Sequence, residues 1–352
     1  MARQLLSLRS PVVRPKVKPT TKYVEFASHL PETLAYHARI LADKPRVDAL
    51  RRAVEFYVNQ ETEFLDVGSG TGIWAILAAK LGAKRVVAVE MEESLIPLIY
   101  KHAQESGVAE SIEIIHGNVD DIKLKGTFNV IVGELFGADV FGYKTTNSFI
   151  NLRKKFLAPD GVIIPQWVRL LAVPLISRRG SAYNLDQLPV STDYLNALRM
   201  NYGKLTTLED RKNFEFAGDP KLLVDIDYLS IDEPAKTAAA IVEWQTKNLS
   251  QINSIMTFSV LQYAPGIELN SLESSTWILE RYDFVPFEID EGSIRFEIKF
   301  DPNGSSWTIS VPSHPEMRPQ TYSPVFGFTR AKMAHAVTPY KSFRSRRTRS
   351  KA

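Results

Sequence analysis

The residues with the clearest chemical potential are three glycines, Gly68, Gly70 and Gly72, in a turn that follows Asp66. Because glycine has no Cβ, the backbone can turn sharply there and a ligand can approach the main chain closely at the start of the following helix. Glu90 ends the next apolar run, and an acid at that point can accept hydrogen bonds from both hydroxyls of a ribose. The pattern predicts a nucleoside-containing ligand over the carboxyl ends of two strands.

The acid before the first glycine narrows the choice of ligand. Dinucleotide sites use a Gly-x-Gly-x-x-Gly loop for a pyrophosphate, but here the order is Asp-Val-Gly-Ser-Gly-Thr-Gly. An acid beside the loop suits a cationic amino-acid group better than a pyrophosphate. The loop resembles the first motif of class I methyltransferases, which implies S-adenosylmethionine as the cofactor. A further acid, Asp120 or Asp121, follows another apolar run and is expected to accept from the adenine amino group.

The elements that must position these residues follow from hydrophobic periodicity. Residues 23–60 have helical spacing, and residues 61–165 alternate strands and helices, which predicts a Rossmann-like parallel sheet. Residues 166–330 carry short alternating runs, which predict an antiparallel β-barrel lobe. Residues 177–212 are polar and partly helical, and they interrupt this pattern as an arm. The predicted fold class is therefore α/β plus all-β. The runs predicted as strands of the barrel are Val168–Val173, Phe214–Phe216, Ala240–Trp244, Ser254–Leu261, Thr276–Leu279, Ser293–Phe300 and Trp307–Val311.

Several local motifs are similar to those of the protein arginine N-methyltransferases. The segment from His37 to Arg46 resembles the helix before the glycine loop in that family, and 156–165 resembles its junction to the barrel. The resemblance implies that Arg46 pairs with the carboxylate of S-adenosylmethionine, that Asp66 lies near its ammonium group, and that His37 contributes to the site. It also implies that the arm at 177–212 joins two copies into a homodimer.

The acceptor side departs from the family pattern. Glu134 ends an apolar run and matches the first of two glutamates that clamp the acceptor guanidinium, whereas the second would fall near Tyr143. Asp139 is the only other acid in this loop, and Ser275-Thr276-Trp277 lacks the histidine of the family's Thr-His-Trp loop. Carboxylates localise the guanidinium charge and direct a lone pair at the methyl group, so we expect Glu134 and Tyr143 to act on the acceptor.

These residues favour a methyltransferase acting on a guanidino nitrogen of arginine in a protein or peptide. One alternative keeps the cofactor but transfers the methyl group to free arginine or another small amine or guanidine. Another alternative is a non-catalytic partner subunit. Metal chemistry is not expected, since the six histidines have no ligand spacing and cysteine is absent.

The net charge of +3 conceals two basic ends. Residues 1–22 and 331–352 are expected to be disordered tails. Residues 1–22 and 341–352 each carry six Lys or Arg and no Asp or Glu. Without these twelve bases, the rest of the chain has 31 Lys and Arg against 40 Asp and Glu, a net charge of about −9. Such tails suit an acidic or nucleic-acid partner. With no apolar run of membrane-spanning length and no signal peptide, we expect a cytoplasmic protein; the acid-free N-terminus makes a mitochondrial location the alternative.

Overall fold

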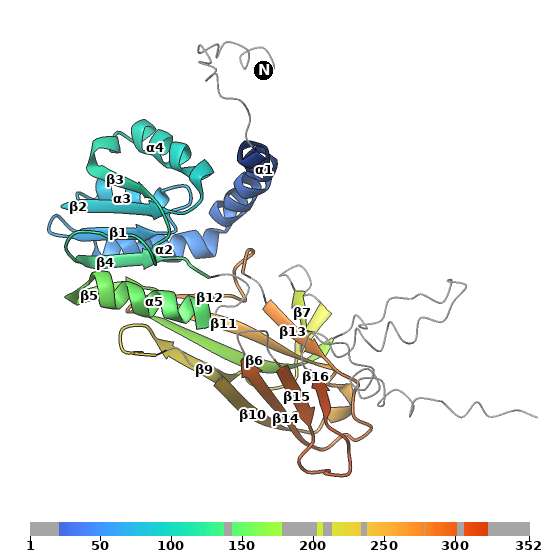
Figure 1. The fold of residues 1–352 in the computed structure, drawn as a ribbon. Helices are drawn as coiled ribbons and strands as arrows, with labels where there is room; N and C mark the ends of the chain where they lie inside the picture. Colours follow the sequence, from blue (N-terminus) through green and yellow to red (C-terminus); the bar gives the residue numbers. More distant parts are fainter. Residues whose placement is uncertain are drawn as a thin grey trace, which may run out of the picture.

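The computed structural model describes residues 21–136, 143–177, 203–206, 213–233, 238–277, 279–300 and 306–322. Within these ranges the chain forms a parallel sheet flanked by helices and an elongated antiparallel lobe that extends from it (Figure 1). The predicted combination of a Rossmann-like sheet with a β-barrel lobe is confirmed. No helix in the described ranges is both long enough and apolar enough to cross a membrane.

The first lobe is built on five parallel strands in the order β3-β2-β1-β4-β5. The strands at its centre are buried on both faces, which explains why their sequences are almost continuously apolar. The strands are β1 (Glu63–Val67), β2 (Arg85–Glu90), β3 (Ile112–His116), β4 (Phe128–Gly133) and β5 (Leu157–Ile164), and the helices between them are α3 (Ile73–Lys80), α4 (Ile96–Glu105) and α5 (Tyr143–Phe156). The carboxyl ends of β1, β2 and β4 therefore meet at one edge, which brings the acids at these ends close together.

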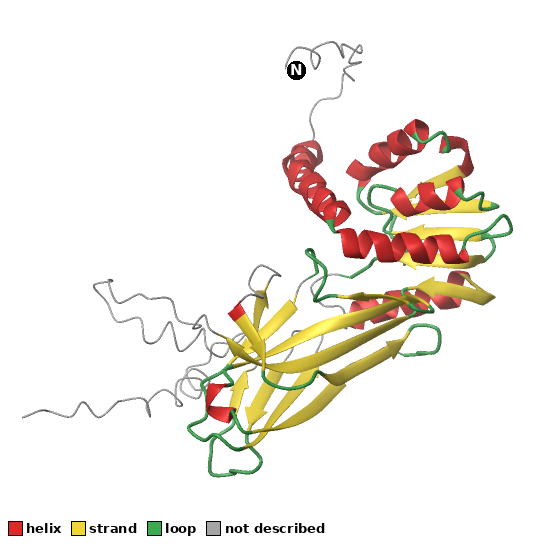
Figure 2. Ribbon diagram, turned by 180° about the vertical axis from the view of Figure 1, so that it is seen from behind, coloured by secondary structure: helices red, strands yellow, loops and turns green. Residues whose placement is uncertain are grey.

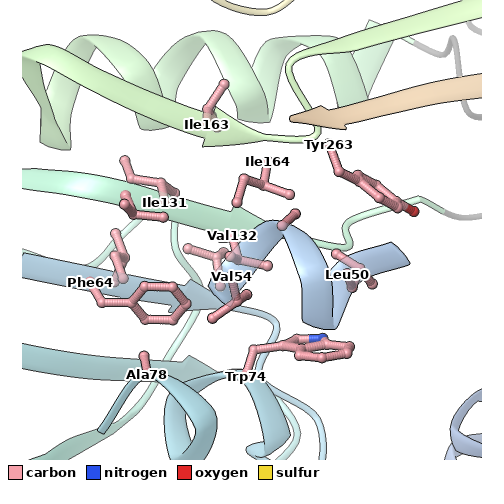
Figure 3. Close-up of a cluster of buried hydrophobic side chains, with 14 of the residues drawn as sticks. Leu50, Val54, Phe64, Trp74, Ala78, Ile131, Val132, Ile163, Ile164 and Tyr263 are labelled. Carbon is pink, nitrogen blue, oxygen red and sulfur yellow. The ribbon is translucent and has the colours of Figure 1, made fainter. Parts of the chain in front are cut away.

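A single hydrophobic core joins this sheet to the helix that precedes it. Leu50 and Val54 of α2 (Lys44–Tyr57) pack with Phe64 of β1 and Ile131 of β4, as Figure 3 shows. Tyr263 from the antiparallel lobe belongs to the same cluster. The helix α2 thus lies between the two lobes and fixes their contact.

Two helices precede the sheet, as expected, and they are separated by one residue. Helix α1 (Thr21–Ala42) ends just before Asp43, and α2 begins at Lys44 with Pro45 in its first turn. Because proline has no backbone N–H and its ring crowds the preceding turn, Pro45 cannot continue α1 and instead starts a new helix. Helix α1 stands beside the carboxyl ends of the parallel strands (Figures 1 and 2).

The second lobe consists of two antiparallel sheets with a shared core. Trp244, Phe296 and Trp307 of one sheet pack in one cluster with Ile255 and Tyr282 of the other. The chain enters this lobe after Ile164–Pro165, a cis peptide. The strands are β6 (Trp167–Ser177), β7 (Gly203–Thr206), β8 (Phe214–Phe216), β9 (Lys221–Asp227), β10 (Ala238–Thr246), β11 (Ser254–Ala264), β12 (Ile267–Asn270), β13 (Leu279–Asp283), β14 (Gly292–Phe300), β15 (Ser306–Ser310) and β16 (Gln320–Tyr322).

Three sequence-based boundaries were wrong. Residues 203–206, assigned to the arm, pair with β13 as β7, and the rest of the arm beyond Ser177 lies outside the described residues. The first residues of α1, Thr21 and Lys22, were assigned to the basic tail. The strand expected from Thr276 begins only at Leu279, because the backbone N–H of Thr276 donates to a side chain instead of a neighbouring strand.

Candidate active site

The glycine loop lies between β1 and α3 and uses conformations that favour glycine. Gly68, Gly70 and Gly72 have φ angles of 67°, 56° and 80°. A Cβ on Gly70 would lie 2.7 Å from Cε1 of His37, and one on Gly72 would lie 2.7 Å from Cγ2 of Ile99. The loop is therefore packed closely between α1 and α4, and side chains at these positions would displace their neighbours.

Glu90 holds the loop in place from the end of β2. Its Oε2 accepts the backbone N–H of Gly70 at 2.7 Å, and its Oε1 accepts that of Glu92 at 2.8 Å. The side chain is buried. Each carboxylate oxygen can accept more than one hydrogen bond, so Glu90 organises the loop and keeps acceptor capacity for a ligand hydroxyl.

Asp66 lies behind the loop. It is 1% exposed, and its Oδ2 accepts the backbone N–H of Ala75 in the first turn of α3 at 3.2 Å. Burial raises the pKa of Asp66 to about 7, with smaller contributions from the charges of Glu134 and Glu90 and an opposing one from its hydrogen bonds. Asp66 does not line the pocket between α1, α2 and the loop, and its expected place beside the ammonium group of the cofactor stays a prediction.

A pocket of about 90 Å³ opens between α1, α2 and the glycine loop. Residues of helix α1 line one side and residues of the loop line the other, and Arg46 and Glu134 also line it. We call it the helix–loop pocket. The residues that line it are Tyr36, His37, Ile40, Leu41, Arg46, Val47, Gly68, Ser69, Gly70, Thr71, Ile73, Trp74 and Glu134.

His37 bridges the two walls of this pocket. Its ring packs against Gly70 and meets the ring of Tyr36 edge-on, with centroids 5.5 Å apart. Burial lowers the pKa of His37, and this effect outweighs the nearby carboxylate of Glu90. The imidazole is therefore neutral at physiological pH and can act as a hydrogen-bond donor or acceptor.

Arg46 and Glu134, which both line the pocket, form an ion pair. Arg46 Nε donates to Glu134 Oε1 at 2.7 Å, and their side chains are 8% and 14% exposed. Burial disfavours the charged guanidinium, but Glu134 raises the pKa of Arg46 above its ordinary value, so the pair is ionised. Among the described residues, neither Arg46 Nη2 nor Glu134 Oε2 has a hydrogen-bond partner. Each member of the pair therefore keeps one atom available for a ligand.

The antiparallel lobe supplies the remaining contacts to Arg46. Its guanidinium carbon lies 5.4 Å from the centroid of the Trp277 ring, and Nη1 donates to Thr276 Oγ1 at 3.4 Å. In the sequence, Thr276 and Trp277 were recognised only as part of a loop that lacks the family's histidine, and their contact with Arg46 was not predicted. Tyr36 and Trp74 were also missed as pocket residues, although Tyr36 precedes His37 directly and Trp74 is in the first turn after the loop.

The other predicted site residues lie elsewhere or outside the described part. Asp120 is exposed, and its carboxylate faces α5, where Ser148 and Asn151 donate to it at 3.4 Å each. Its neighbour Asp121 is exposed too, and neither residue lines the helix–loop pocket. The backbone of Tyr143 begins α5, but its side chain lies outside the described residues, as does all of Asp139. Among the described residues there is no cluster of metal-ligating side chains.

Comparisons with known proteins agree with this geometry. The family model described as ribosomal protein L11 methyltransferase (PrmA) matches residues 49–164. Protein arginine N-methyltransferase PRMT10 of Oryza sativa subsp. japonica is 34% identical over 164 residues, which cover 44% of this chain and 42% of that protein. Ribosomal protein arginine N-methyltransferase rmt3 of Schizosaccharomyces pombe is 35% identical over 140 residues, or 38% of this chain and 25% of that protein. The matches thus span less than half the length of these curated relatives.

Solved structures extend the likeness in fold to most of the chain. The structure of Arabidopsis thaliana protein arginine methyltransferase 10 in an open conformation matches 82% of this chain and 98% of its own, with a TM-score of 0.66 and 19% identity. The Trypanosoma brucei PRMT1 enzyme–prozyme heterotetrameric complex with AdoHcy matches 81% of this chain and 96% of its own, with a TM-score of 0.68 and 18% identity. The chain is therefore similar to the protein arginine N-methyltransferases, in sequence over less than half of its length and in fold over most of it.

Proposed function

We propose that this protein is an S-adenosylmethionine-dependent methyltransferase that transfers a methyl group to a guanidino nitrogen of arginine in a protein or peptide. The observation that carries the proposal is the Arg46–Glu134 pair in the lining of the helix–loop pocket. It puts a cation for a carboxylate ligand and a carboxylate for a guanidinium ligand side by side, next to a glycine loop. The likeness to arginine methyltransferases supports this assignment.

The residues present fit the cofactor. Arg46 Nη2 would bind its carboxylate, since no described residue occupies that atom, and the close turn at Gly68 and Gly70 admits a ligand next to the backbone. The helix–loop pocket of about 90 Å³ is smaller than the roughly 300–1,000 Å³ of typical ligand pockets, so it can enclose only the amino-acid end. The nucleoside end would extend over the strand ends, where Glu90 retains acceptor capacity and Met91 is exposed.

S-adenosylmethionine supplies an electrophilic methyl group when bound. The protein therefore has mainly to orient the nucleophile. Glu134 Oε2 would accept from the acceptor guanidinium at the carboxyl end of β4, while Oε1 remains on Arg46. A carboxylate on one nitrogen draws the positive charge toward it and leaves another nitrogen with more lone-pair character.

One observation favours the alternative of a small-molecule acceptor such as free arginine or another small guanidine. Glu134 already shares one oxygen with Arg46, so in the described residues a single carboxylate oxygen faces the acceptor, where a bidentate clamp would use two carboxylates. Competition between an arginine-rich peptide and free arginine for labelled methyl groups distinguishes the two; a label found only on the small molecule would overturn the peptide assignment.

We further propose that the protein acts as a homodimer. Helix α1 exposes Leu34 at 41%, beside the pocket residues Tyr36 and Leu41 at 47% and 38%, and it contacts the rest of the chain mainly through α2. A second copy that covers α1 would hold it over the cofactor, so assembly would support binding. The expected contact is the arm at 177–212. The similar Trypanosoma brucei enzyme–prozyme complex is a heterotetramer, which shows that chains of this fold can assemble.

A further inference from the structure

Asp43, the residue between α1 and α2, fastens the helices to the antiparallel lobe. It is 1% exposed, and its Oδ2 accepts three hydrogen bonds from a loop more than 230 positions away in sequence. The donors are Ser274 Oγ at 2.5 Å, the Thr276 backbone N–H at 3.0 Å and Thr276 Oγ1 at 2.5 Å. Oδ1 is buried and has no partner among the described residues, so the contact is made entirely through Oδ2.

The hydroxyl of Thr276 connects Asp43 to Arg46. A hydroxyl has one proton and two lone pairs. Because Thr276 Oγ1 donates its proton to Asp43, it must present a lone pair to Arg46, whose Nη1 donates to the same oxygen at 3.4 Å. The distance is at the long end for a hydrogen bond, but the donor is charged, which strengthens it. Reversing the hydroxyl would turn its proton toward the guanidinium and replace attraction with repulsion.

The charge state of Asp43 fixes this orientation. Burial tends to raise the pKa of Asp43, but the hydrogen bonds from Ser274 and Thr276 outweigh it and hold the pKa below its ordinary value. The carboxylate is therefore ionised at neutral pH, and it can accept all three hydrogen bonds. The same loop also fixes the ring beside Arg46, since the Trp277 backbone N–H donates to Ser274 Oγ at 3.0 Å.

We propose that Asp43 is a positioning residue that, through the hydroxyl of Thr276, orients the guanidinium of Arg46 so that Nε faces Glu134 and Nη2 faces the helix–loop pocket. The inference rests on the proposed function for its consequence, which is that the barrel lobe sets the affinity for the cofactor carboxylate. Neither Asp43 nor Thr276 lines the pocket, so neither would contact the ligand directly, and both would affect its binding through Arg46.

The orientation of Arg46 can be measured without any ligand. In protein labelled with 15N-arginine, a guanidinium held at both ends rotates slowly and gives separate Nη1 and Nη2 signals, and Arg46→Lys identifies those of Arg46. We expect separate signals in the wild type and in Thr276→Ser, which keeps the hydroxyl. Thr276→Val and Asp43→Asn should merge them. Separate signals that persist in both of these variants would overturn the proposal.

A matched control removes a similar hydroxyl elsewhere. Ser254 Oγ donates to buried Asp283 at 2.8 Å within the antiparallel lobe, away from Arg46. Ser254→Ala should lower the melting temperature about as much as Thr276→Val and leave the Arg46 signals separate. If Ser254→Ala merges them as well, the effect is a general loss of stability, and the specific role of Asp43 is wrong.

Calorimetry with S-adenosylmethionine then tests the consequence. We expect Asp43→Asn and Thr276→Val each to bind about 5-fold more weakly than the wild type, within the range of one lost hydrogen bond, and Thr276→Ser to bind within about 2-fold. Since both residues act through one hydroxyl, the double variant should bind no more weakly than the weaker single variant. Fully additive losses would contradict the relay. If the wild type binds no S-adenosylmethionine, the proposed function is wrong, while the arginine signals still decide the role of Asp43.

Discussion

Arg46 Nε lies 2.7 Å from Glu134 Oε1, so the residue expected to hold the cofactor and the residue expected to hold the acceptor bind each other directly. The two come from α2 and from the end of β4, 88 positions apart. The pair is largely buried, so removing either charge would leave the other uncompensated. Substitutions at this pair therefore need to keep the hydrogen bond if they are to report on chemistry alone.

Glu134→Gln keeps the hydrogen bond, because the amide oxygen can still accept from Arg46, and it removes only the negative charge. We expect kcat to fall about 100-fold or more, as is typical when a group that orients or deprotonates the nucleophile is lost, while the dissociation constant for S-adenosylmethionine changes by less than about 3-fold. Steady-state kinetics and calorimetry provide the two numbers. Glu93→Gln, an exposed acid beyond β2, is the control. A Glu134→Gln enzyme with normal turnover would show that Glu134 has no part in acceptor chemistry.

Gly70→Ala should weaken cofactor binding through a steric effect on His37. The new Cβ would lie 2.7 Å from the His37 ring at a φ of 56°, so both backbone strain and displacement of α1 are expected. Gly107 has a φ of 73° with nothing within 4 Å, so Gly107→Ala carries the strain alone, about 1–2 kcal/mol. Thermal melting should show a loss for both variants. Calorimetry should show at least about 10-fold weaker S-adenosylmethionine binding only for Gly70→Ala; equal binding by the two variants would rule out the close contact.

Asp66 should make the free energy of unfolding depend on pH. Its pKa is raised to about 7 in the folded protein from near 4 in the unfolded chain, so the folded state binds more protons between these values. Stability from this group is fully present below about pH 4 and is lost as the pH rises toward 7. Asp66→Asn keeps an acceptor for the Ala75 N–H and cannot ionise. Its stability relative to the wild type should therefore increase between pH 5 and pH 8, by an amount on the order of 2–4 kcal/mol. Parallel curves for the two proteins in urea titrations at several pH values would refute the shift.

The exposed face of α1 provides a test of the homodimer. Leu34→Asp should give a monomer at micromolar concentration, because burying the new charge in an interface is costly. Leu222→Asp changes a leucine that is also exposed, on β9 of the antiparallel lobe, and should stay dimeric. Sedimentation velocity distinguishes the two. A wild-type chain that is monomeric and active at that concentration would contradict the assembly.

Local patterns in the sequence predict the parallel sheet and its loop well. Buried strands such as β1, β2 and β4 are mostly apolar, and Gly or Glu stands at or directly after their carboxyl ends, so their existence and the edge they share can be read directly. The strands β9, β12 and β16 were missed. In β9 the burial pattern is irregular at a register shift, and β12 and β16 have only four and three residues, so none shows a clear alternation.

The contacts that complete the site could not be read from spacing. Asp43 reaches Ser274 and Thr276 across more than 230 positions, and the choice of these partners depends on how the antiparallel lobe packs on α2. Local pattern also does not fix side-chain direction. Asp66 and Glu90 were predicted as ligand-binding residues, and the pattern gave no sign that both also accept backbone N–H groups at the loop and the helix after it.

The most direct test of the account is methyl transfer itself. The purified full-length chain is incubated with methyl-labelled S-adenosylmethionine and an arginine-rich peptide, and fragmentation mass spectrometry locates the label. The account predicts label on a guanidino nitrogen of arginine with the wild type and almost none with Glu134→Gln, at equal occupancy by S-adenosylmethionine. Label on another side chain, or a wild type that binds S-adenosylmethionine but methylates neither the peptide nor free arginine, would contradict it.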